Sequence, residues 1–173
     1  MNKPILAMTG LALAIAAHAA SKPVTVALND AKGASVGTAT IAEGKGGKGV
    51  TIKANLKGLP PGEHAFHFHG VAKCEAPAFT SAGGHFNPDM KHHGINNPES
   101  PKPHAGDMAN FMVKPNGTAK FTLVNADVNL GSDAHSLFSN GGTALMIHAK
   151  ADDLKSDPAG NAGDRIACGV ITK

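Results

Sequence analysis

The sequence has no tryptophan and no tyrosine, and aromatic residues make up only 4% of its 173 positions. Proteins that bind single-stranded nucleic acid usually stack the bases on aromatic side chains. The formal net charge is only +3, and the charged residues are scattered along the chain rather than gathered into a basic stripe. The composition therefore argues against a nucleic acid as the partner.

Long apolar segments are equally scarce. The main apolar run, residues 5–17, is too short to cross a bilayer comfortably, so we expect no membrane anchor. With Lys3 before it and small residues at its end, the run has the layout of a secretory signal peptide. No cysteine stands at the cleavage point to carry a lipid. We therefore predict a signal peptide over residues 1–19 and one exported domain over residues 20–173.

Cysteine is nearly absent, since the chain has only Cys74 and Cys168. In an oxidising compartment, pairing is the default for two cysteines. A bridge between them would close a loop of 94 residues, for which chain entropy gives roughly 4 to 5 kcal/mol of stabilisation. The alternative, two free buried thiols, fits an exported chain less well.

Amphipathic helices of convincing length are missing too. Instead, several short segments alternate apolar and polar residues between Gly-rich turns, which predicts antiparallel strands. These segments are residues 24–30, 35–43, 50–58, 64–70, 117–128, 142–150 and 165–173. The glycine-rich residues 43–49 lack the order of a phosphate-binding loop and predict a hairpin turn.

Two long irregular stretches, residues 71–110 and 151–164, separate the later strands and are rich in Gly, Pro, Asn and Asp. Loops of this length are uncommon in compact domains unless they carry function. About eight short strands with two long loops predict an all-β fold. We expect an eight-stranded antiparallel Greek-key barrel or sandwich whose two long loops build a functional site.

Histidines are concentrated in the segment HAFHFH, residues 64–69. Side chains alternate between the two faces of a strand, so His67 and His69 should project from one face as two nitrogen ligands for one metal ion. The alternative is a buried His-rich strand without ligands. His148, in a later strand, offers a third imidazole, and copper favours several imidazoles in a roughly planar arrangement.

The first long loop adds a second series of candidate ligands. Three imidazoles and one carboxylate satisfy a tetrahedral zinc ion, and the loop provides them as His85, His93, His104 and Asp107. The alternative is a solvated polar loop. Two four-coordinate ions need more ligand positions than the seven candidate residues offer, so one residue could serve both metals. Spacing alone does not identify it.

Five segments of the chain resemble, in order and spacing, the motifs of the copper, zinc superoxide dismutases: HAFHFHG, AGGHFNPDMKHHG, PHAGDMANF, TALMIHAKADD and GDRIACGVI. The resemblance covers nearly the whole mature chain. It implies one copper ion per subunit, held by His67, His69, His85 and His148. It also implies one zinc ion per subunit, held by His85, His93, His104 and Asp107. His85 would then be the bridging imidazolate and take part in catalysis.

The same resemblance assigns roles outside the ligand set. Cys74 and Cys168 would form the intrasubunit disulfide of the family. Asp152 would link His67 to His93 and fix the orientation of both rings; the alternative is an exposed Asp in a turn. Arg165 would draw the anionic substrate toward copper, because Arg keeps its charge at neutral pH; the alternative is an Arg that faces solvent at the start of a strand.

The chain also departs from the family pattern. Its second long loop is shorter than in the familiar eukaryotic members, and their charged guiding cluster has no clear counterpart. Lys155 is a candidate substitute, although a surface lysine is the simpler interpretation. We expect His64 to be structural or to support a ligand rather than to bind metal itself, and we expect no ligand role for His92 or His135. The signal peptide, the short second loop and the segment HAGDMANF together resemble the bacterial, periplasmic branch.

The function implied by this resemblance is that of a superoxide dismutase acting in the periplasm on the superoxide anion, with copper redox cycling and a structural and tuning zinc. The alternative is a periplasmic copper- and zinc-binding carrier or storage module without turnover. A purely structural Greek-key domain would leave seven ordered ligand residues unexplained. Both a monomer and a homodimer are compatible with the sequence, and neither a nucleic acid nor a membrane is expected as partner.

Overall fold

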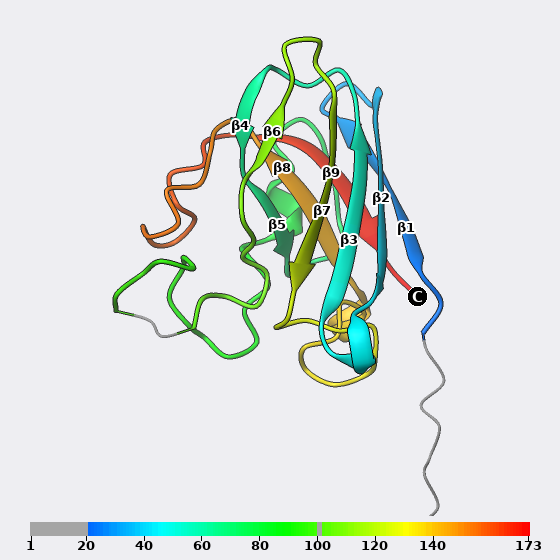
Figure 1. The fold of residues 1–173 in the computed structure, drawn as a ribbon, viewed down its shortest axis with the longest axis vertical. Coiled ribbons are helices and arrows are strands. Elements are labelled where there is room, and N and C mark those ends of the chain that lie inside the picture. The colour runs from blue at the N-terminus through cyan, green and yellow to red at the C-terminus, as the bar shows by residue number, and fades with distance from the viewer. Residues whose placement is uncertain (1–20, 100–101) are drawn as a thin grey trace, which may run out of the picture.

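The computed structural model describes residues 21–99 and 102–173, which form a curled antiparallel sheet with two long loops on one side (Figure 1). The predicted signal peptide lies outside the described residues. Nine strands are present in this part of the chain: β1 (Val24–Asp30), β2 (Ser35–Glu43), β3 (Val50–Leu56), β4 (Gly62–His64), β5 (Phe66–His69), β6 (Phe111–Val113), β7 (Ala119–Asn125), β8 (Thr143–His148) and β9 (Arg165–Ile171). Three short 3-10 turns accompany them: η1 (Lys45–Gly47), η2 (Thr80–Ala82) and η3 (Ser139–Gly141).

Seven strands form one sheet in the order β5-β8-β9-β1-β2-β3-β7, and β4 and β6 form a two-stranded sheet. All of these strand pairs are antiparallel. In Figure 1, β8 and β9 pass behind β7 and β3, so the large sheet folds over on itself. The neighbours β3–β7, β5–β8 and β9–β1 are far apart in sequence, which requires the crossing connections of a Greek key. The predicted all-β class is confirmed.

The structure differs from the predicted strands at two places. The segment predicted as one strand, residues 64–70, is divided at Ala65: β4 pairs with β6, whereas β5 pairs with β8. The main chain of Ala65 bonds instead to Lys150 and His148. β6 is not predicted, because its three residues are too few to show an alternating pattern in the sequence. The division and β6 each add one strand to the seven segments predicted from the sequence, which gives nine, close to the expected eight.

The core follows from the alternation of side chains along each strand. In β3, Val50, Ile52, Ala54 and Leu56 are buried, while Lys53 and Asn55 between them are exposed. β5 and β8 are different, because every residue of both strands is buried. One face of β5 sends Phe66 and Phe68 into the barrel core, where burial of each such side chain contributes about 1.5–3 kcal/mol. Its other face therefore lies under the long loops.

A second, smaller core fixes the beginning of the first long loop. Phe79 and Ala82 from this loop pack on Ala144, Met146 and Cys168 of the sheet. Cys74, next to this cluster, forms the disulfide with Cys168 across 94 positions of sequence. The predicted disulfide is confirmed, and it attaches the loop to β9.

Residues 43–49 form the turn between β2 and β3, where Gly46, Gly47 and Gly49 adopt positive φ angles. Among the residues that the structure describes, no helix is long and apolar enough to cross a membrane.

Candidate metal centre

Two groups of side chains with ligand atoms within 4.8 Å of one another occur in the described part of the chain. The four-histidine cluster consists of His67, His69, His85 and His148, and the loop cluster consists of His85, His93, His104 and Asp107. His85 belongs to both clusters. All seven residues are those singled out from the sequence as candidate ligands, and the fold brings every one of them into one of the two groups.

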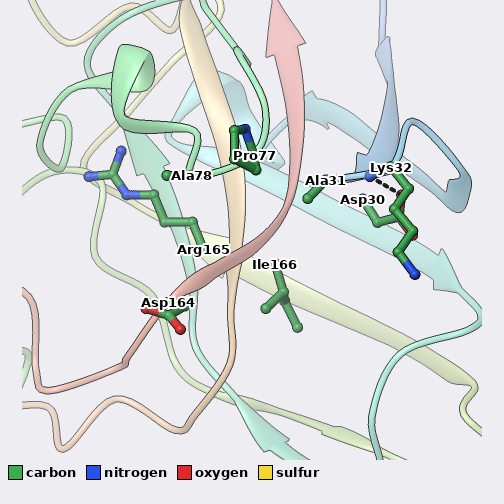
Figure 2. A pocket seen from close by; sticks show the side chains of 8 residues that line it. All are labelled: Asp30, Ala31, Lys32, Pro77, Ala78, Asp164, Arg165 and Ile166. Atoms are coloured by element: carbon green, nitrogen blue, oxygen red, sulfur yellow. Dashed lines mark hydrogen bonds between the residues drawn. The ribbon is translucent and has the colours of Figure 1, made fainter.

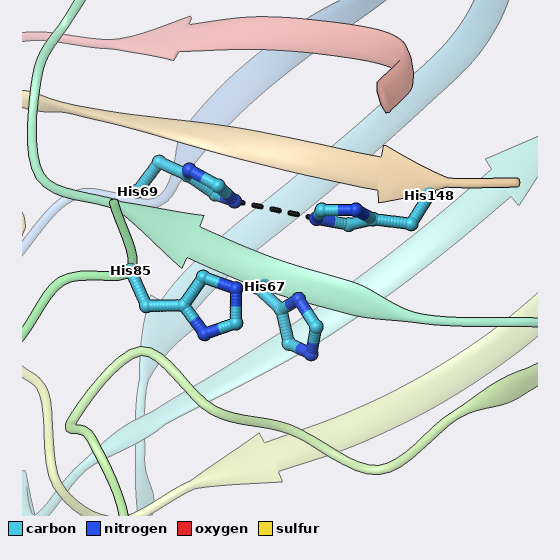
Figure 3. Close-up of side chains that lie close together, drawn as sticks. All are labelled: His67, His69, His85 and His148. Atoms are coloured by element: carbon cyan, nitrogen blue, oxygen red, sulfur yellow. Dashed lines mark hydrogen bonds between the residues drawn. The ribbon is translucent and has the colours of Figure 1, made fainter. Parts of the chain in front are cut away.

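The strands and the first loop position the four-histidine cluster (Figure 3). His67 and His69 lie on the loop-facing side of β5, and His148 ends β8, which pairs with β5. His85 reaches them because its main chain forms an isolated antiparallel bridge with His69. The next loop residue continues this pairing, since the amide of Phe86 donates to the carbonyl of Phe68 over 2.8 Å.

Hydrogen bonds determine which ring nitrogens of this cluster carry a lone pair. Nδ1 of His69 donates to the carbonyl of Gly83 over 2.9 Å, and Nδ1 of His148 donates to the carbonyl of Gly163 over 3.2 Å. Because a carbonyl only accepts, a neutral ring keeps its lone pair on Nε2. The two Nε2 atoms face each other at 3.4 Å (Figure 3). Two lone pairs at this distance repel unless a cation lies between them.

The other two rings offer lone pairs in the same way. Nε2 of His67 donates to Asp152 over 2.8 Å, which leaves the buried Nδ1 of His67 without a hydrogen-bond partner in residues 21–99 and 102–173. Nε2 of His85 is buried and equally unpaired within the described chain. Each such orphaned nitrogen is costly unless it binds a ligand. The four-histidine cluster therefore fits copper, which imidazoles suit.

Burial keeps these imidazoles neutral. Desolvation lowers the pKa of His69 to about 2 and the pKa of His85 and His148 to about 4. It also lowers the pKa of His67, against the hydrogen bond to Asp152. Neutral rings are the form that binds a metal ion.

The loop cluster has the donor set of a zinc site. Asp107 Oδ1 lies 2.8 Å from Nδ1 of His85, and Asp107 Oδ2 lies 3.0 Å from Nδ1 of His93. Nδ1 of His93 and Nδ1 of His104 are buried, and neither makes a hydrogen bond within the described residues. Three imidazole nitrogens and one carboxylate converge, which is a tetrahedral set that zinc accepts.

The surroundings of Asp107 favour the ionised carboxylate. Burial by itself raises the pKa of Asp107, but the close imidazole nitrogens of His104, His85 and His93 outweigh it and lower this pKa far below its usual range. The amide of Gly94 adds a further bond to Oδ2 over 2.9 Å. The loop cluster thus holds a fixed negative charge where a cation is expected.

Asp152 connects the two clusters by contacting one ring of each, on the side opposite the buried Nδ1 of that ring. Its Oδ2 accepts from Nε2 of His67 over 2.8 Å, and its Oδ1 lies 3.0 Å from Nε2 of His93. The side chain of Asn110 holds the main chain of Asp152 in turn: Nδ2 donates to the carbonyl of Asp152, and Oδ1 accepts from the amide of Asp152. Gly160 lies against this junction: a Cβ there would overlap the Asp152 carboxylate and crowd Nε2 of His93. Only a residue without a side chain leaves room for the bridge.

Arg165 begins β9 opposite His148. Its two terminal nitrogens donate to the carbonyls of Phe79 and Gly83, each over 2.7 Å. The Gly83 carbonyl also accepts from His69, so one carbonyl ties the guanidinium to the four-histidine cluster. Figure 2 shows the stem of Arg165 along a pocket of about 460 Å³ and its charged end turned away from that pocket, toward the first loop.

The remaining histidines lie outside both clusters. His64 is buried between the carbonyls of His148 and Pro60, each at 2.8 Å from a ring nitrogen. His92 pairs with Asp157, and His135 with Asp89. Lys155 is exposed in the second loop.

Several parts of the site escaped the sequence analysis. The carbonyls of Gly83 and Gly163, which orient two rings, belong to the main chain and leave no sequence signal. Asn110 and Gly160 are ordinary loop residues until the fold places them against Asp152.

Comparison with known proteins matches residues 35–171 to the family model described as copper/zinc superoxide dismutase. The chain is 51% identical over 146 residues to superoxide dismutase [Cu-Zn] 2 of Aquifex aeolicus, covering 83% of each chain. It is 36% identical over 150 residues to superoxide dismutase [Cu-Zn] of Caulobacter vibrioides, covering 85% of this chain and 84% of the relative.

Solved structures agree with these relatives. A SOD-like protein from Bacillus subtilis superposes with a TM-score of 0.80 at 36% identity, covering 84% of this chain and 96% of the other. The Cu/Zn superoxide dismutase from Brucella abortus superposes with a TM-score of 0.68 at 30% identity, covering 87% and 99%.

Proposed function

Because this chain belongs to the copper/zinc superoxide dismutase family, we propose that the four-histidine cluster holds copper, that the loop cluster holds zinc, and that His85 bridges the two ions. The family reaction converts two superoxide anions and two protons into dioxygen and hydrogen peroxide. Copper, when bound, supplies the one-electron redox chemistry, while zinc has none and serves structure and tuning. The chain is therefore an oxidoreductase that depends on copper and zinc.

The observation that carries the copper assignment is the 3.4 Å approach of the Nε2 atoms of His69 and His148. Both Nδ1 atoms are engaged with carbonyls, so both lone pairs point at one place. We assign proton handling to Nε2 of His85, the buried nitrogen of the shared ring. Asp152 fixes the ring orientation of His67 and His93, as carboxylates bonded to ligand imidazoles generally do.

Arg165 is assigned to guide the substrate. Its guanidinium cannot lose its charge at neutral pH, and two carbonyls hold it beside the four-histidine cluster. A small anion offers few contacts, so a long-range field is the effective means of attracting it. A metal carrier would need neither this cation nor a ligand shared between two ions, which disfavours the carrier alternative.

We further propose export to the periplasm, with residues 1–19 as the signal peptide and residues 20–173 as the mature domain. Two features support this: the sequence layout of residues 1–19, and the bridge between Cys74 and Cys168, since disulfides persist in oxidising compartments. N-terminal sequencing of protein from the periplasmic fraction should begin at Ala20; a chain that begins at Met1 there would contradict the proposal.

The metal assignment is tested by elemental analysis together with a superoxide-consumption assay. We expect one copper and one zinc per mature chain and activity that requires copper. A single equivalent of total metal in fully loaded protein would contradict two sites that share His85. Copper-loaded protein without turnover would favour the carrier.

The guiding role of Arg165 is tested by Arg165→Glu in protein whose copper and zinc contents are measured in the same sample. We expect a sharply lower second-order rate, because a negative charge now repels the anion near its target, and a wild-type rate that falls as salt rises. Lys53→Glu makes the same change of charge on an exposed position of β3 and is the matched control. An equal loss of rate in both variants would show that only net charge matters.

A further inference from the structure

His93 is held at its main chain as well as at its ring. Its amide donates to Oδ1 of Asp157 over 2.5 Å, and its carbonyl accepts from the side chain of Asn97 over 2.8 Å. Its ring contacts Asp152 on one side and Asp107 on the other. Asp157 and Asp152 both belong to the second long loop, so this loop reaches His93 at two different points.

We propose that Asp157 is a positioning residue for the zinc site: it fixes the main chain of His93, and thereby the direction in which this ring presents Nδ1. Asp157 itself touches neither the proposed metal positions nor the substrate. The inference rests on the assignment of zinc to the loop cluster made above.

Asp157 positions His93 through its bond to the main chain of His93, and not through its ion pair with His92. Oδ2 of Asp157 lies 2.6 Å from Nδ1 of His92, but the two side chains are 43% and 59% exposed. Exposed ion pairs contribute little because water and salt screen them. The other carboxylate oxygen of Asp157 accepts from the amide of His93, a residue that is fully buried. Because the acceptor is a carboxylate, this bond is stronger than one between neutral groups. This bond is also the first cause of the lowered pKa of Asp157.

The surrounding contacts explain why the second loop can act on His93. The amide of Asn96 donates to the carbonyl of Leu154 over 3.0 Å. Gly94 lies so close to Leu154 that a Cβ there would overlap the Leu154 carbonyl. Residues 93–96 and 154–157 therefore form a continuous seam between the two loops, with Asp157 at one end of it.

The experiment measures the rate at which zinc leaves the copper- and zinc-loaded mature chain in excess EDTA. Carboxylates that orient ligand imidazoles change metal affinity by about 10- to 100-fold when removed, so we expect Asp157→Ala to release zinc about 10 to 100 times faster than wild type. Asp157→Asn keeps an oxygen for the His93 amide and should release zinc at an intermediate rate. His92→Ala removes only the exposed pair and should release zinc at the wild-type rate.

The matched controls are Asp153→Ala and Asp153→Asn. Asp153 lies in the same loop, but its carboxylate accepts from Lys155, Ser156 and Asn161 and makes no bond to the described part of the first loop. These controls disturb the second loop without touching His93. The absorption spectrum of cobalt bound in place of zinc reports ligand geometry, and it should change in the Asp157 variants but not in the Asp153 variants.

Three results would overturn the proposal. The first is a wild-type release rate in both Asp157 variants, and the second is equally fast release from the Asp153 controls, which would mean that loop order alone matters. Should Asp157→Ala not fold, the zinc release rates of Asp157→Asn and Asp153→Asn are compared instead. The third is a wild-type chain that binds no zinc in the loop cluster; this overturns the zinc assignment itself and is recognised before any variant is compared.

Discussion

At the scale of single residues, hydrogen bonds to the main chain decide what each histidine can do. The carbonyls of Gly83 and Gly163 occupy one nitrogen each of His69 and His148, and the opposite nitrogens become available for a metal ion. His64 shows the contrast, because a carbonyl lies against each of its ring nitrogens, so neither nitrogen is open to a metal ion. The chemistry of an imidazole in this protein is thus set by its hydrogen-bond partners rather than by its residue type.

Gly160 allows a prediction at this scale. Gly160→Ala places a methyl group on the Asp152 carboxylate and against His93, so we expect weaker binding of both metals, by about 10- to 100-fold, as for loss of a partner of a ligand imidazole. Competition with a chelator of known affinity measures this.

Gly46→Ala is the matched control for the backbone. Gly46 also has a positive φ, of 70°, but a Cβ there meets no described atom within 4 Å. Its substitution should cost about 1–2 kcal/mol of folding stability from the left-handed conformation alone and leave metal binding unchanged. Equal metal affinity in the two variants would contradict the role given to Gly160.

At the scale of elements, β5 and β8 are the two strands that connect the core to the site. Because side chains alternate along a strand, the same six residues of β8 supply Leu145 and Ile147 to the barrel core and end in His148 at the four-histidine cluster. Any shift of register by one residue would exchange these faces. The ligand geometry is therefore specified by core packing.

The disulfide stabilises the part of the first loop, residues 79–83, whose carbonyls hold Arg165. The double variant Cys74→Ser, Cys168→Ser should lose roughly 4 to 5 kcal/mol of unfolding free energy if chain entropy dominates. The segment that carries the Phe79 and Gly83 carbonyls should also become more mobile, because it packs beside the bridge. Denaturant titration measures the first effect, and hydrogen exchange of residues 79–83 measures the second.

Reduced wild-type protein is the control for this prediction, and it should unfold at the same denaturant concentration as the double variant. If oxidised and reduced wild-type proteins unfold at the same concentration, the bridge does not stabilise the loop.

His135 connects another pair of loops. Nδ1 of His135 bonds to the carbonyl of Asp127 and Nε2 to Asp89. The bond to the Asp127 carbonyl is the main cause that raises the pKa of His135, with the charges of Asp89 and Asp133 adding to it. A raised pKa means that the contribution is complete below the unfolded value of about 6.5 and is lost as pH rises through the folded pKa.

We therefore expect His135→Ala to destabilise the protein more at pH 6 than at pH 9. Denaturant titrations of wild type and variant at both pH values provide the measurement, with His92→Ala as the control for loss of an exposed imidazole. A difference between wild type and His135→Ala that is independent of pH would contradict this interpretation.

At the scale of the whole molecule, we expect the two long loops, and not the barrel, to depend on the proposed metals. The sheet has its own core and an uninterrupted set of antiparallel pairs. The second loop meets the first through Asp152, which contacts His93 and Asn110, and through the seam that includes Leu154 and Asp157. A ligand that binds only the folded state stabilises it by mass action.

Removal of both metals should therefore lower the melting temperature. It should also increase hydrogen exchange in residues 71–110 and 151–164 while the amides of β1, β2 and β3 stay protected. The stabilisation expected at a metal concentration of 1,000 times Kd is about 4 kcal/mol. Uniform loss of protection over strands and loops would mean that the barrel does not fold independently of the site.

Much of this protein was determined by local sequence. Alternation in residues 24–30, 35–43 and 50–58 predicted the strands, because a strand with one buried face must repeat every two residues. His67 and His69 could be placed on one face for the same reason. The two cysteines predicted their bridge because no other partner existed in the chain.

Only the tertiary structure decided the rest, because contacts between residues far apart in sequence have no local signature. The division of residues 64–70 at Ala65 depends on pairing with β6 and β8, two strands that are distant in sequence and become neighbours only in the folded chain. The lone pairs of His69 and His148 depend on carbonyls that any residue could supply. The bond from His93 to Asp157 joins positions 64 residues apart, and it exists only because two irregular loops meet on one side of the barrel.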